Sequence, residues 1–408
     1  MKVVVYNLGC KVNQYESDGI ITKLSSLGYE VSDSLQYADV YVLNTCAVTN
    51  EAEKKSRQAV SRCLHFNKNA KIIVCGCASQ NDFKQFEDKN GVTYISGVAN
   101  KNKIPELIEQ QGIFVAPISN QYEEELQPNL IRTRAYVKIQ DGCNNFCAYC
   151  LIPYLRGRSR SRSVQSIVAE CERLAKVTNE IVLTGIDMSS YGIDFGSSLS
   201  NLLKALSHIN VRIRLGSLET RVITDDLLKA TIGLKKFCTH FHLSLQSGND
   251  QTLKDMNRKY TTEFYMSRVD LIRKYYPKAA ITTDLICGFP TETEEQFAGT
   301  LEFIDKVSFS DMHIFAYSKR EGTAAAKYKM LCGDVVKNRT KQAEQIALKN
   351  KEAYYKSFIG KSLEVLLESD GGYSKEYLKV MCSGEEGQIK IVTPCAYDNE
   401  KQCLICGE

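Results

Sequence analysis

The sequence predicts an α/β protein of three domains: an N-terminal parallel α/β domain, a central partial (β/α)6 barrel and a small C-terminal antiparallel β module. Three patterns in the 408 residues lead to this prediction. In the first part of the chain, apolar β-rich runs alternate with helical patterns, which is typical of a parallel sheet covered by helices. Six more strand candidates follow, separated by helical stretches. The end of the chain alternates apolar and polar residues at period two, as antiparallel strands do.

Three cysteines follow strands of the predicted N-terminal domain, whose strands are "VVVYN", "DVYVL" and "KIIV". Cys10, Cys46 and Cys77, which we call the N-terminal triplet, each lie three residues beyond the end of a strand. Because the carboxyl ends of parallel strands share one edge of a sheet, we expect the three thiols to converge on a common point. Cys75 competes for the third place, but Gly76 permits the turn that carries Cys77 over the edge. The alternative is that these cysteines are buried core residues.

We place the N-terminal domain at residues 1–118 and a polar, proline-containing linker, "SNQYEEELQPNL", at 119–130. The barrel domain follows at 131–358, and its predicted strands are "RAYVKIQ", "EIVLTG", "RIRLGSLE", "HFHLSLQSG", "AAITTDLICGF" and "DMHIFAYS". The active site of such a barrel lies at the carboxyl ends of its strands. The β module occupies 359–408, with strands at "KSLEVLLES", "EYLKVMCS" and "GQIKIVTP" between glycine-rich turns.

The composition fits a soluble globular protein, with 43% hydrophobic and 25% charged residues. No apolar run approaches the roughly 18 residues that would cross a bilayer, and the start of the chain has the pattern of a first strand and not of a signal peptide. We therefore expect a cytoplasmic protein with no membrane partner. Its 16 cysteines indicate metal binding, redox chemistry or burial, and not a disulfide framework. The net charge of +4 is too small to predict nucleic-acid binding by itself.

The first predicted barrel strand is followed by "DGCNNFCAYC", in which Cys143, Cys147 and Cys150 form a C-x3-C-x2-C pattern that we call the barrel triplet. A closed zinc or iron–sulfur site takes four protein ligands, so three thiolates leave one metal position open for chemistry. Thiolates select soft iron or zinc, and a compact loop suits a cubane cluster bound through three corners. The alternative is a zinc knuckle whose fourth ligand comes from elsewhere in the chain.

The pattern C-x3-C-x-aromatic-C, with Tyr149 in the aromatic place, resembles the radical S-adenosylmethionine (radical SAM) superfamily. The segments "DGCNNFCAYCLIPYLRGRSRSR", "LTGIDMSSYG", "RLGSLE", "LSLQSGNDQTLKDMNRKY" and "GFPTET" resemble, in order, the barrel signatures of its methylthiotransferases. The segments "NLGCKVNQYE", "LNTCAVTN" and "GCASQ" resemble the N-terminal domain of the same enzymes. In addition, "GYSKEYLKV" resembles their TRAM module, an RNA-binding β barrel. The resemblance covers nearly the whole chain.

This resemblance implies two [4Fe-4S] clusters and S-adenosyl-L-methionine (SAM) as cofactors. It makes the barrel triplet catalytic, because the cluster bound there donates an electron to SAM and releases a 5′-deoxyadenosyl radical. It places the auxiliary cluster, which presents sulfur to the substrate carbon, on the N-terminal triplet. The implied partners are tRNA, through an adenosine of the anticodon loop, and an electron donor protein. Neither DNA nor a membrane is implied as a partner.

Two segments indicate one branch of the family. "GCKVN" and "DGCNNFCAYC" are similar to the branch that methylthiolates C2 of N6-threonylcarbamoyladenosine beside the anticodon of tRNA, whereas the isopentenyladenosine branch typically has "GCQMN". We therefore expect a methylthiotransferase that acts on threonylcarbamoyladenosine. Two alternatives stay open: an enzyme of the isopentenyladenosine branch, and a non-catalytic iron–sulfur or zinc protein that only binds RNA.

Candidate contacts for SAM lie in the barrel, in the cysteine loop and at or beyond strand ends. They are Tyr149, Thr184, Gly185, Glu219, Gln246 and Arg258. Gly185 allows close approach of the backbone to the methionine amine. The polar side chains can hydrogen-bond to ribose or carboxylate groups, and each has an ordinary structural role as its alternative.

Four arginines alternate along "LRGRSRSR", directly beyond the barrel triplet. They are Arg156, Arg158, Arg160 and Arg162. In an extended segment this alternation puts all four guanidinium groups on one face, so we predict that they bind RNA phosphates near the active site. The alternative is a solvated basic loop. In the β module, Tyr373 and Tyr377 are candidates for stacking on bases or for core packing.

Overall fold

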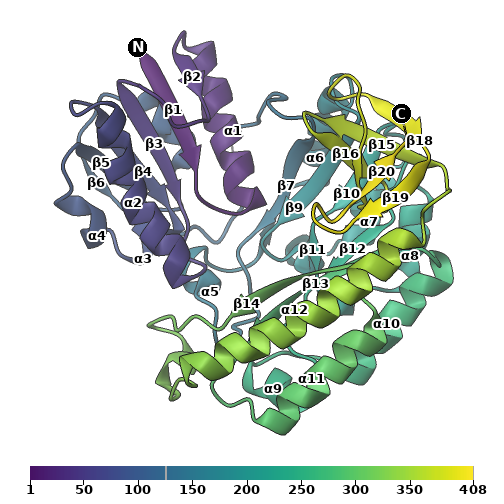
Figure 1. The fold of residues 1–408 in the computed structure, drawn as a ribbon. Helices are drawn as coiled ribbons and strands as arrows, with labels where there is room; N and C mark the ends of the chain where they lie inside the picture. The colour runs from purple at the N-terminus through teal and green to yellow at the C-terminus, as the bar shows by residue number, and fades with distance from the viewer. Residues whose placement is uncertain (125, 408) are drawn as a thin grey trace.

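The structure is a computed structural model that describes residues 1–124 and 126–407. Its N-terminal part is a six-stranded parallel sheet in the order β2-β1-β3-β4-β5-β6 (Figure 1). The strands are β1 (Lys2–Asn7), β2 (Glu30–Ser32), β3 (Val40–Thr45), β4 (Lys71–Gly76), β5 (Val92–Ser96) and β6 (Gly112–Phe114). The helices are α1 (Lys11–Ser26), α2 (Asn50–Phe66), α3 (Cys77–Asn81), α4 (Lys84–Glu87) and the 3-10 helix η1 (Lys101–Glu106).

Helices cover both faces of this sheet because side chains alternate along each strand. On the central strand β3, Val42 packs into a core with residues of α1, and its neighbour Leu43 packs into a second core with residues of α2. The strand order reverses between β1 and β3, and ligands bind at such a switch point, outside the carboxyl ends of the strands. Cys10 follows β1 and Cys46 follows β3, so this edge of the sheet carries both thiols.

The central part is a curved, mostly parallel barrel wall made of two four-stranded sheets, in the orders β10-β9-β7-β8 and β11-β12-β13-β14. The strands are β7 (Ala135–Asp141), β8 (Arg160–Ser161), β9 (Glu180–Gly185), β10 (Arg212–Leu215), β11 (Ser217–Leu218), β12 (His240–Leu243), β13 (Ala280–Cys287) and β14 (Asp311–Ala316). Gly216 alone separates β10 from β11, so the two sheets are consecutive parts of one wall. The short β8 runs antiparallel to β7. The predicted partial barrel is confirmed.

Helices lie between these strands and after them in the chain. They are α5 (Ile152–Leu155), α6 (Val164–Leu174), α7 (Leu199–Ala205), α8 (Asp225–Ile232), α9 (Asp250–Asp255), α10 (Thr262–Tyr275), α11 (Glu294–Val307) and α12 (Gly333–Lys356), with 3-10 helices η2 (Met188–Ser190), η3 (Ile193–Phe195), η4 (Thr220–Val222) and η5 (Ala324–Lys327). Helices α6, α8, α10 and α11 each begin after a serine or threonine whose hydroxyl accepts a hydrogen bond from the first turn. In the described part of the chain, no helix is long and apolar enough to cross a membrane.

The C-terminal part is a six-stranded sheet in the order β18-β15-β16-β17-β20-β19, antiparallel except for the parallel pair β17 and β20. Its strands are β15 (Leu363–Glu368), β16 (Gly371–Ser374), β17 (Lys379–Met381), β18 (Ile389–Val392), β19 (Pro394–Asp398) and β20 (Cys403–Cys406). The sheet lies against the barrel (Figure 1), where Arg212 donates to the backbone oxygen of Glu364 and Arg214 to that of Ser374. The predicted fold class is therefore confirmed, and the exact domain boundaries stay a prediction.

Candidate active site

The barrel triplet lies in the loop that follows β7. Gly142 begins this loop with a φ of +72°, and a Cβ atom there would lie 2.0 Å from the backbone oxygen of Arg158, so only glycine fits this close crossing of two chain segments. Cys143, Cys147 and Cys150 are half-buried. Burial raises the pKa of Cys143 and of Cys150 to about 12, and the charges of neighbouring thiols act in the same direction. A bound metal would supply the positive charge that three such thiolates need.

The N-terminal triplet gathers at the switch point of the N-terminal sheet. Cys10 precedes α1, Cys46 follows β3 and Cys77 begins α3. Burial raises the pKa of Cys46 to about 11, and the charges of Cys77 and Cys10 add to this effect. The charge of Cys77 also contributes to the raised pKa of Cys150. The two triplets therefore lie within electrostatic reach of each other, where the N-terminal sheet meets the barrel.

Gly76 separates the two candidates for the third place in the N-terminal triplet. Its φ is +105°, and a Cβ atom there would lie 2.5 Å from the backbone oxygen of Thr45, so this turn requires glycine. The turn brings Cys77 to the start of α3. Cys75, in contrast, has no exposed surface and packs in the core on the α1 side of the sheet, where burial raises its pKa to about 12. This geometry favours Cys77 as the third ligand.

Arg258 and Glu219 meet beside the barrel triplet. Nη1 of Arg258 donates to Sγ of Cys147 over 3.3 Å and lies 3.0 Å from a carboxylate oxygen of Glu219. Glu219 also accepts a hydrogen bond of 3.0 Å from Asn145, which stands between the cysteines in the loop. A fixed positive charge next to a thiol stabilises its thiolate. Asn145 was not among the predicted site residues, although its place inside the cysteine motif was a signal.

Two cavities adjoin the triplets. The larger, of about 460 Å³, which we call the large cavity, is lined by Cys10, Thr184 and Gly185 among other residues. The smaller, of about 260 Å³, is lined by Tyr149 and Gln246 among others. The six candidate SAM contacts therefore form three pairs. Thr184 and Gly185 line the large cavity, Tyr149 and Gln246 line the smaller one, and Glu219 and Arg258 lie beside Cys147. The structure brings them to the same end of the barrel, where Asp284 lines both cavities.

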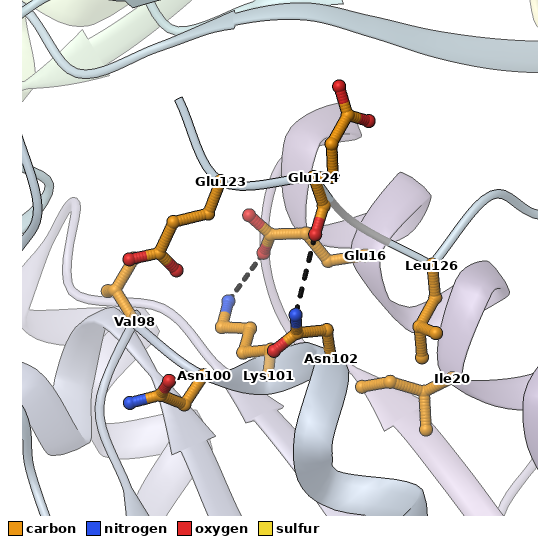
Figure 2. A pocket seen from close by; sticks show the side chains of 9 residues that line it. All are labelled: Glu16, Ile20, Val98, Asn100, Lys101, Asn102, Glu123, Glu124 and Leu126. Atoms are coloured by element: carbon orange, nitrogen blue, oxygen red, sulfur yellow. Dashed lines mark hydrogen bonds and ion pairs between the residues drawn. The ribbon is translucent and has the colours of Figure 1, made fainter. Parts of the chain in front are cut away.

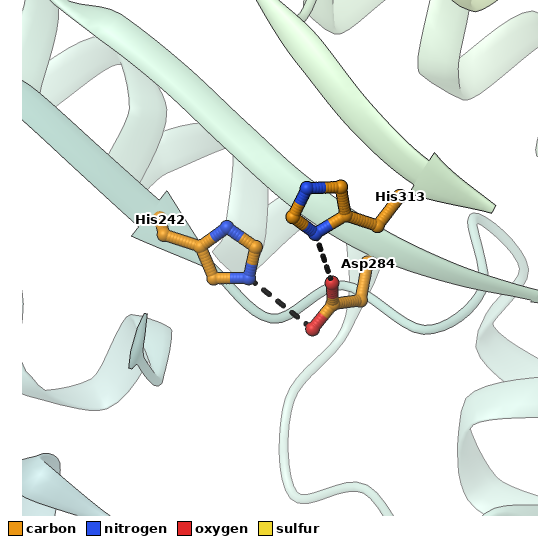
Figure 3. Close-up of side chains that lie close together, drawn as sticks. All are labelled: His242, Asp284 and His313. Atoms are coloured by element: carbon orange, nitrogen blue, oxygen red, sulfur yellow. Dashed lines mark hydrogen bonds and ion pairs between the residues drawn. The ribbon is translucent and has the colours of Figure 1, made fainter. Parts of the chain in front are cut away.

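Several polar residues of the large cavity were not among the predicted site residues. They are Lys11, His240, His242, Asp284 and His313. Figure 3 shows the last three: one oxygen of Asp284 lies 3.2 Å from Nε2 of His242, and the other lies 3.2 Å from Nδ1 of His313. Although burial opposes it, these two imidazoles hold the pKa of Asp284 well below its usual range. The alternation of His240 and His242 along β12 was a signal that both face the same side of the wall.

Two family models match the chain: the Radical SAM superfamily at residues 137–304 and the uncharacterized protein family UPF0004 at residues 2–97. The threonylcarbamoyladenosine tRNA methylthiotransferase MtaB of Bacillus subtilis is 38% identical over 96% of this chain and 92% of that protein. The protein of the same name from Thermotoga maritima is 39% identical over 93% of this chain and 91% of that one. The chain belongs to the tRNA methylthiotransferases of the radical SAM superfamily. A tRNA-2-methylthio-N(6)-dimethylallyladenosine synthase of Staphylococcus haemolyticus is 34% identical over 99% of this chain and 84% of that protein.

Solved structures share the fold of this methylthiotransferase. The radical S-adenosylmethionine methyltransferase TsrM from Kitasatospora setae matches with a TM-score of 0.56 and 13% identity, over 77% of this chain and 74% of that one. The cobalamin-dependent S-adenosylmethionine radical enzyme OxsB matches with a TM-score of 0.53 and 13% identity, over 84% of this chain and 56% of that one. At this level of identity the likeness concerns the fold alone.

The prediction that the four arginines form one face that binds RNA is wrong for this methylthiotransferase. Arg156, Arg160 and Arg162 have exposed fractions of only 0%, 7% and 1%, and Arg162 forms an ion pair with Glu170. Of the four, only Arg158 is exposed. The physical reason is the pairing of β8 with β7, which turns the segment back into the protein instead of leaving it extended on the surface. The three buried arginines are therefore not available to RNA.

The buried arginines neutralise carboxylates between the N-terminal sheet and the barrel. Nη1 of Arg156 donates to Glu16 over 2.9 Å and to both oxygens of Asp141 over 3.1 Å. Lys101, seen against Glu16 in Figure 2, and Lys138 complete a set that we call the ion network. Although burial opposes it, Arg156 and the two lysines hold the pKa of Glu16 well below its usual range. Since buried charges need such partners, the network has a structural role in the methylthiotransferase.

One tyrosine of the C-terminal part also reaches the site. Tyr377 lines the large cavity, and its ring stacks on His240 with centroids 4.1 Å apart and planes 5° from parallel. Tyr373 stacks on the ring of Tyr377 in turn, at 5.3 Å. Both tyrosines thus stack on protein rings, which favours the packing alternative over exposed base stacking.

Proposed function

We propose that this methylthiotransferase converts the C2 hydrogen of N6-threonylcarbamoyladenosine, beside the anticodon of tRNA, into a methylthio group. The observation that carries the proposal is the pair of cysteine triplets: they lie within electrostatic reach of each other, and Cys10 of the N-terminal triplet lines the large cavity. A reaction that activates a carbon and then adds sulfur to it needs two reactive centres close together. The names of the Bacillus subtilis and Thermotoga maritima relatives support threonylcarbamoyladenosine as the substrate.

The donor sets fit two [4Fe-4S] clusters, because each triplet offers three thiols and leaves one iron open. Cys143, Cys147 and Cys150 would hold the first cluster, and the N-terminal triplet would hold the auxiliary cluster. When bound, the clusters and S-adenosyl-L-methionine supply radical chemistry, a sulfur atom and a methyl group. The guanidinium of Arg258 stabilises negative charge on Cys147, and Glu219 holds this guanidinium in place.

The other candidate contacts belong to the same proposal. Thr184 and Gly185 would contact SAM from the large cavity, and Tyr149 and Gln246 would contact it from the smaller one. Arg158 is the exposed arginine that we keep as a contact for RNA phosphates.

We further propose the setting of the reaction. The protein would work in the cytoplasm, receive electrons from a donor protein and have tRNA, but neither DNA nor a membrane, as its partner. Residues 1–118, 131–358 and 359–408 would be its three domains, the last a TRAM-like module that binds RNA.

The test is mass spectrometry of tRNA nucleosides after anaerobic incubation with reconstituted protein, reductant and SAM. Two tRNA preparations are compared, one with threonylcarbamoyladenosine and one with isopentenyladenosine. A methylthio product from the first supports the proposal. A product from the second alone would move the protein to the isopentenyladenosine branch, which relatives named as dimethylallyladenosine synthases also represent. Intact clusters without 5′-deoxyadenosine or product would favour the RNA-binding alternative.

Cysteine variants separate the two triplets. We expect Cys143→Ala to reduce both 5′-deoxyadenosine and product to background, whereas Cys46→Ala should keep SAM cleavage and lose the methylthio product. Cys171→Ala and Cys63→Ala are matched controls, since each replaces a buried cysteine of the same domain outside the triplets. Full product from Cys46→Ala would show that the auxiliary site is assigned wrongly.

A further inference from the structure

The large cavity is lined by a lysine that forms no ion pair with any residue that the structure describes. Lys11, the lysine of "GCKVN", lies in the first turn of α1 directly after Cys10 and lines this cavity. Within the described residues it forms no ion pair. The carboxylates on the same cavity are already engaged, because Asp284 contacts two imidazoles and Asp311 lies 3.0 Å from Lys351.

His313 offers a second donor to the same cavity. Its Nδ1 faces Asp284 over 3.2 Å, so the carboxylate holds a proton on this nitrogen and orients the ring. His313 is the exposed member of the trio, whereas His242 is half-buried and also contacts Thr282 over 3.0 Å. This arrangement leaves Nε2 of His313 for a ligand.

His240 adds an independent sign that the cavity has a polar ligand. It is only 4% exposed and lines the cavity. Its Nε2 contacts Thr282 over 2.8 Å, but its Nδ1 has no hydrogen-bond partner in the described part of the chain. Since buried polar atoms are nearly always hydrogen-bonded, a group that is not part of the protein is expected here.

We infer that Lys11 and His313 bind the carboxylate of the threonylcarbamoyl side chain, and that this contact selects the substrate. The inference rests on the proposed function. The threonylcarbamoyl group ends in a carboxylate and a hydroxyl, whereas the isopentenyl group is a hydrocarbon. A hydrocarbon would leave Lys11 and His313 without partners, which costs binding energy, whereas a carboxylate gains charge-assisted hydrogen bonds from both. The volume of about 460 Å³ is in the usual range for small-molecule sites.

A metal ion is the competing occupant, since two imidazoles and a carboxylate lie within 4.8 Å of one another. The hydrogen bonds favour the anion. His242 and His313 engage different oxygens of Asp284, so the carboxylate bridges two rings instead of offering one oxygen to a shared centre.

The test uses the full-length protein with both clusters and two anticodon stem-loops that differ in one group. One carries threonylcarbamoyladenosine, and the other carries the same nucleoside with a carboxamide in place of the carboxylate. Dissociation constants are measured without reductant, so that binding is tested apart from turnover. The variants are Lys11→Gln and His313→Asn, with Lys11→Arg as the conservative replacement. Lys68→Gln and His65→Gln are controls at exposed positions of the N-terminal part.

We expect the wild-type protein to bind the carboxylate stem-loop about ten-fold or more tightly than the carboxamide one. Lys11→Gln and His313→Asn should lose most of this preference, whereas Lys11→Arg and the two controls should keep it. An unchanged preference in both variants, or an equal loss of affinity for both stem-loops, would overturn the inference. So would one equivalent of zinc or manganese that the wild type binds and His313→Asn does not. If the preference is found but no methylthio product forms, the inference stands and the proposed function fails.

Discussion

Two groups of cations lie beside α1, and they differ in whether carboxylates of the protein pair with every member of the group. In the ion network, Arg156 is fully buried and lies between Glu16 and Asp141, so its charge is neutralised by the chain itself. In the large cavity, Lys11 has no such partner among the described residues, and His313 has one free ring nitrogen. Lys11 and Glu16 belong to the same helix. The comparison teaches that paired charge holds the N-terminal sheet on the barrel, whereas unpaired charge marks a place for a ligand.

The largest expected effect comes from breaking the paired group. Arg156→Met leaves two carboxylates with less positive charge in a buried site, so it should lower the free energy of unfolding by about 3–5 kcal/mol. Denaturant titration followed by circular dichroism measures this change. Arg158→Met is the control, because Arg158 is exposed and packs on the ring of Phe146 at 4.4 Å, and its stability should change little. Equal stability of both variants would contradict the structural role of the network.

A smaller effect is expected in the large cavity when the pH changes. The hydrogen bond with Asp284 raises the pKa of His313, with further help from the charge of Asp311 and opposition from burial and Lys11. The centroid of the His242 ring lies 5.8 Å from that of the His313 ring. Because the imidazolium attracts a carboxylate, binding of the carboxylate stem-loop should be strongest below this pKa and weaken as the pH rises through it.

Between about pH 6 and pH 9, the dissociation constant of the carboxylate stem-loop should rise about ten-fold. Fluorescence anisotropy of labelled stem-loops measures it, with the carboxamide stem-loop and the His313→Asn variant as references. A wild-type profile as flat as that of His313→Asn would contradict the contact.

The smallest effect is expected at Arg158, which belongs to neither group of cations. Arg158 is exposed, so a contact with one phosphate should release about one counterion. Arg158→Gln should weaken tRNA binding by a few-fold and reduce the slope of affinity against salt by about 1. Filter binding at several salt concentrations measures the slope, and Arg158→Lys should preserve it. An unchanged slope in Arg158→Gln would exclude the phosphate contact.

The fold and the cysteine triplets were predictable because their signals are local. Strand alternation and the offset of Cys10, Cys46 and Cys77 can be counted along the chain, and the parallel sheet then brings the thiols to one edge. The role of Arg156 was not predictable in this way. Its partner Glu16 is 140 positions away, and the alternation of arginines carries no information about that pairing.

The histidine cluster depended on strand register. Asp284 and His313 are direct neighbours in the pairing of β13 with β14, and His242 pairs with Thr282 one strand further along. Each strand shows only two or three polar positions among apolar residues. Only the order β12-β13-β14 brings these positions together on the large cavity.

The stack of Tyr377 on His240 joins the C-terminal part of the chain to the large cavity. Tyr377 lies in the turn between β16 and β17 and lines the same cavity as Cys10, so the C-terminal part of the chain supplies part of the wall of the large cavity. A protein cut after α12 would lose Tyr377 and leave the ring of His240 without its stacking partner. A chain shortened in this way would keep the cysteine triplets, Lys11 and His313 but lack part of the wall of the large cavity.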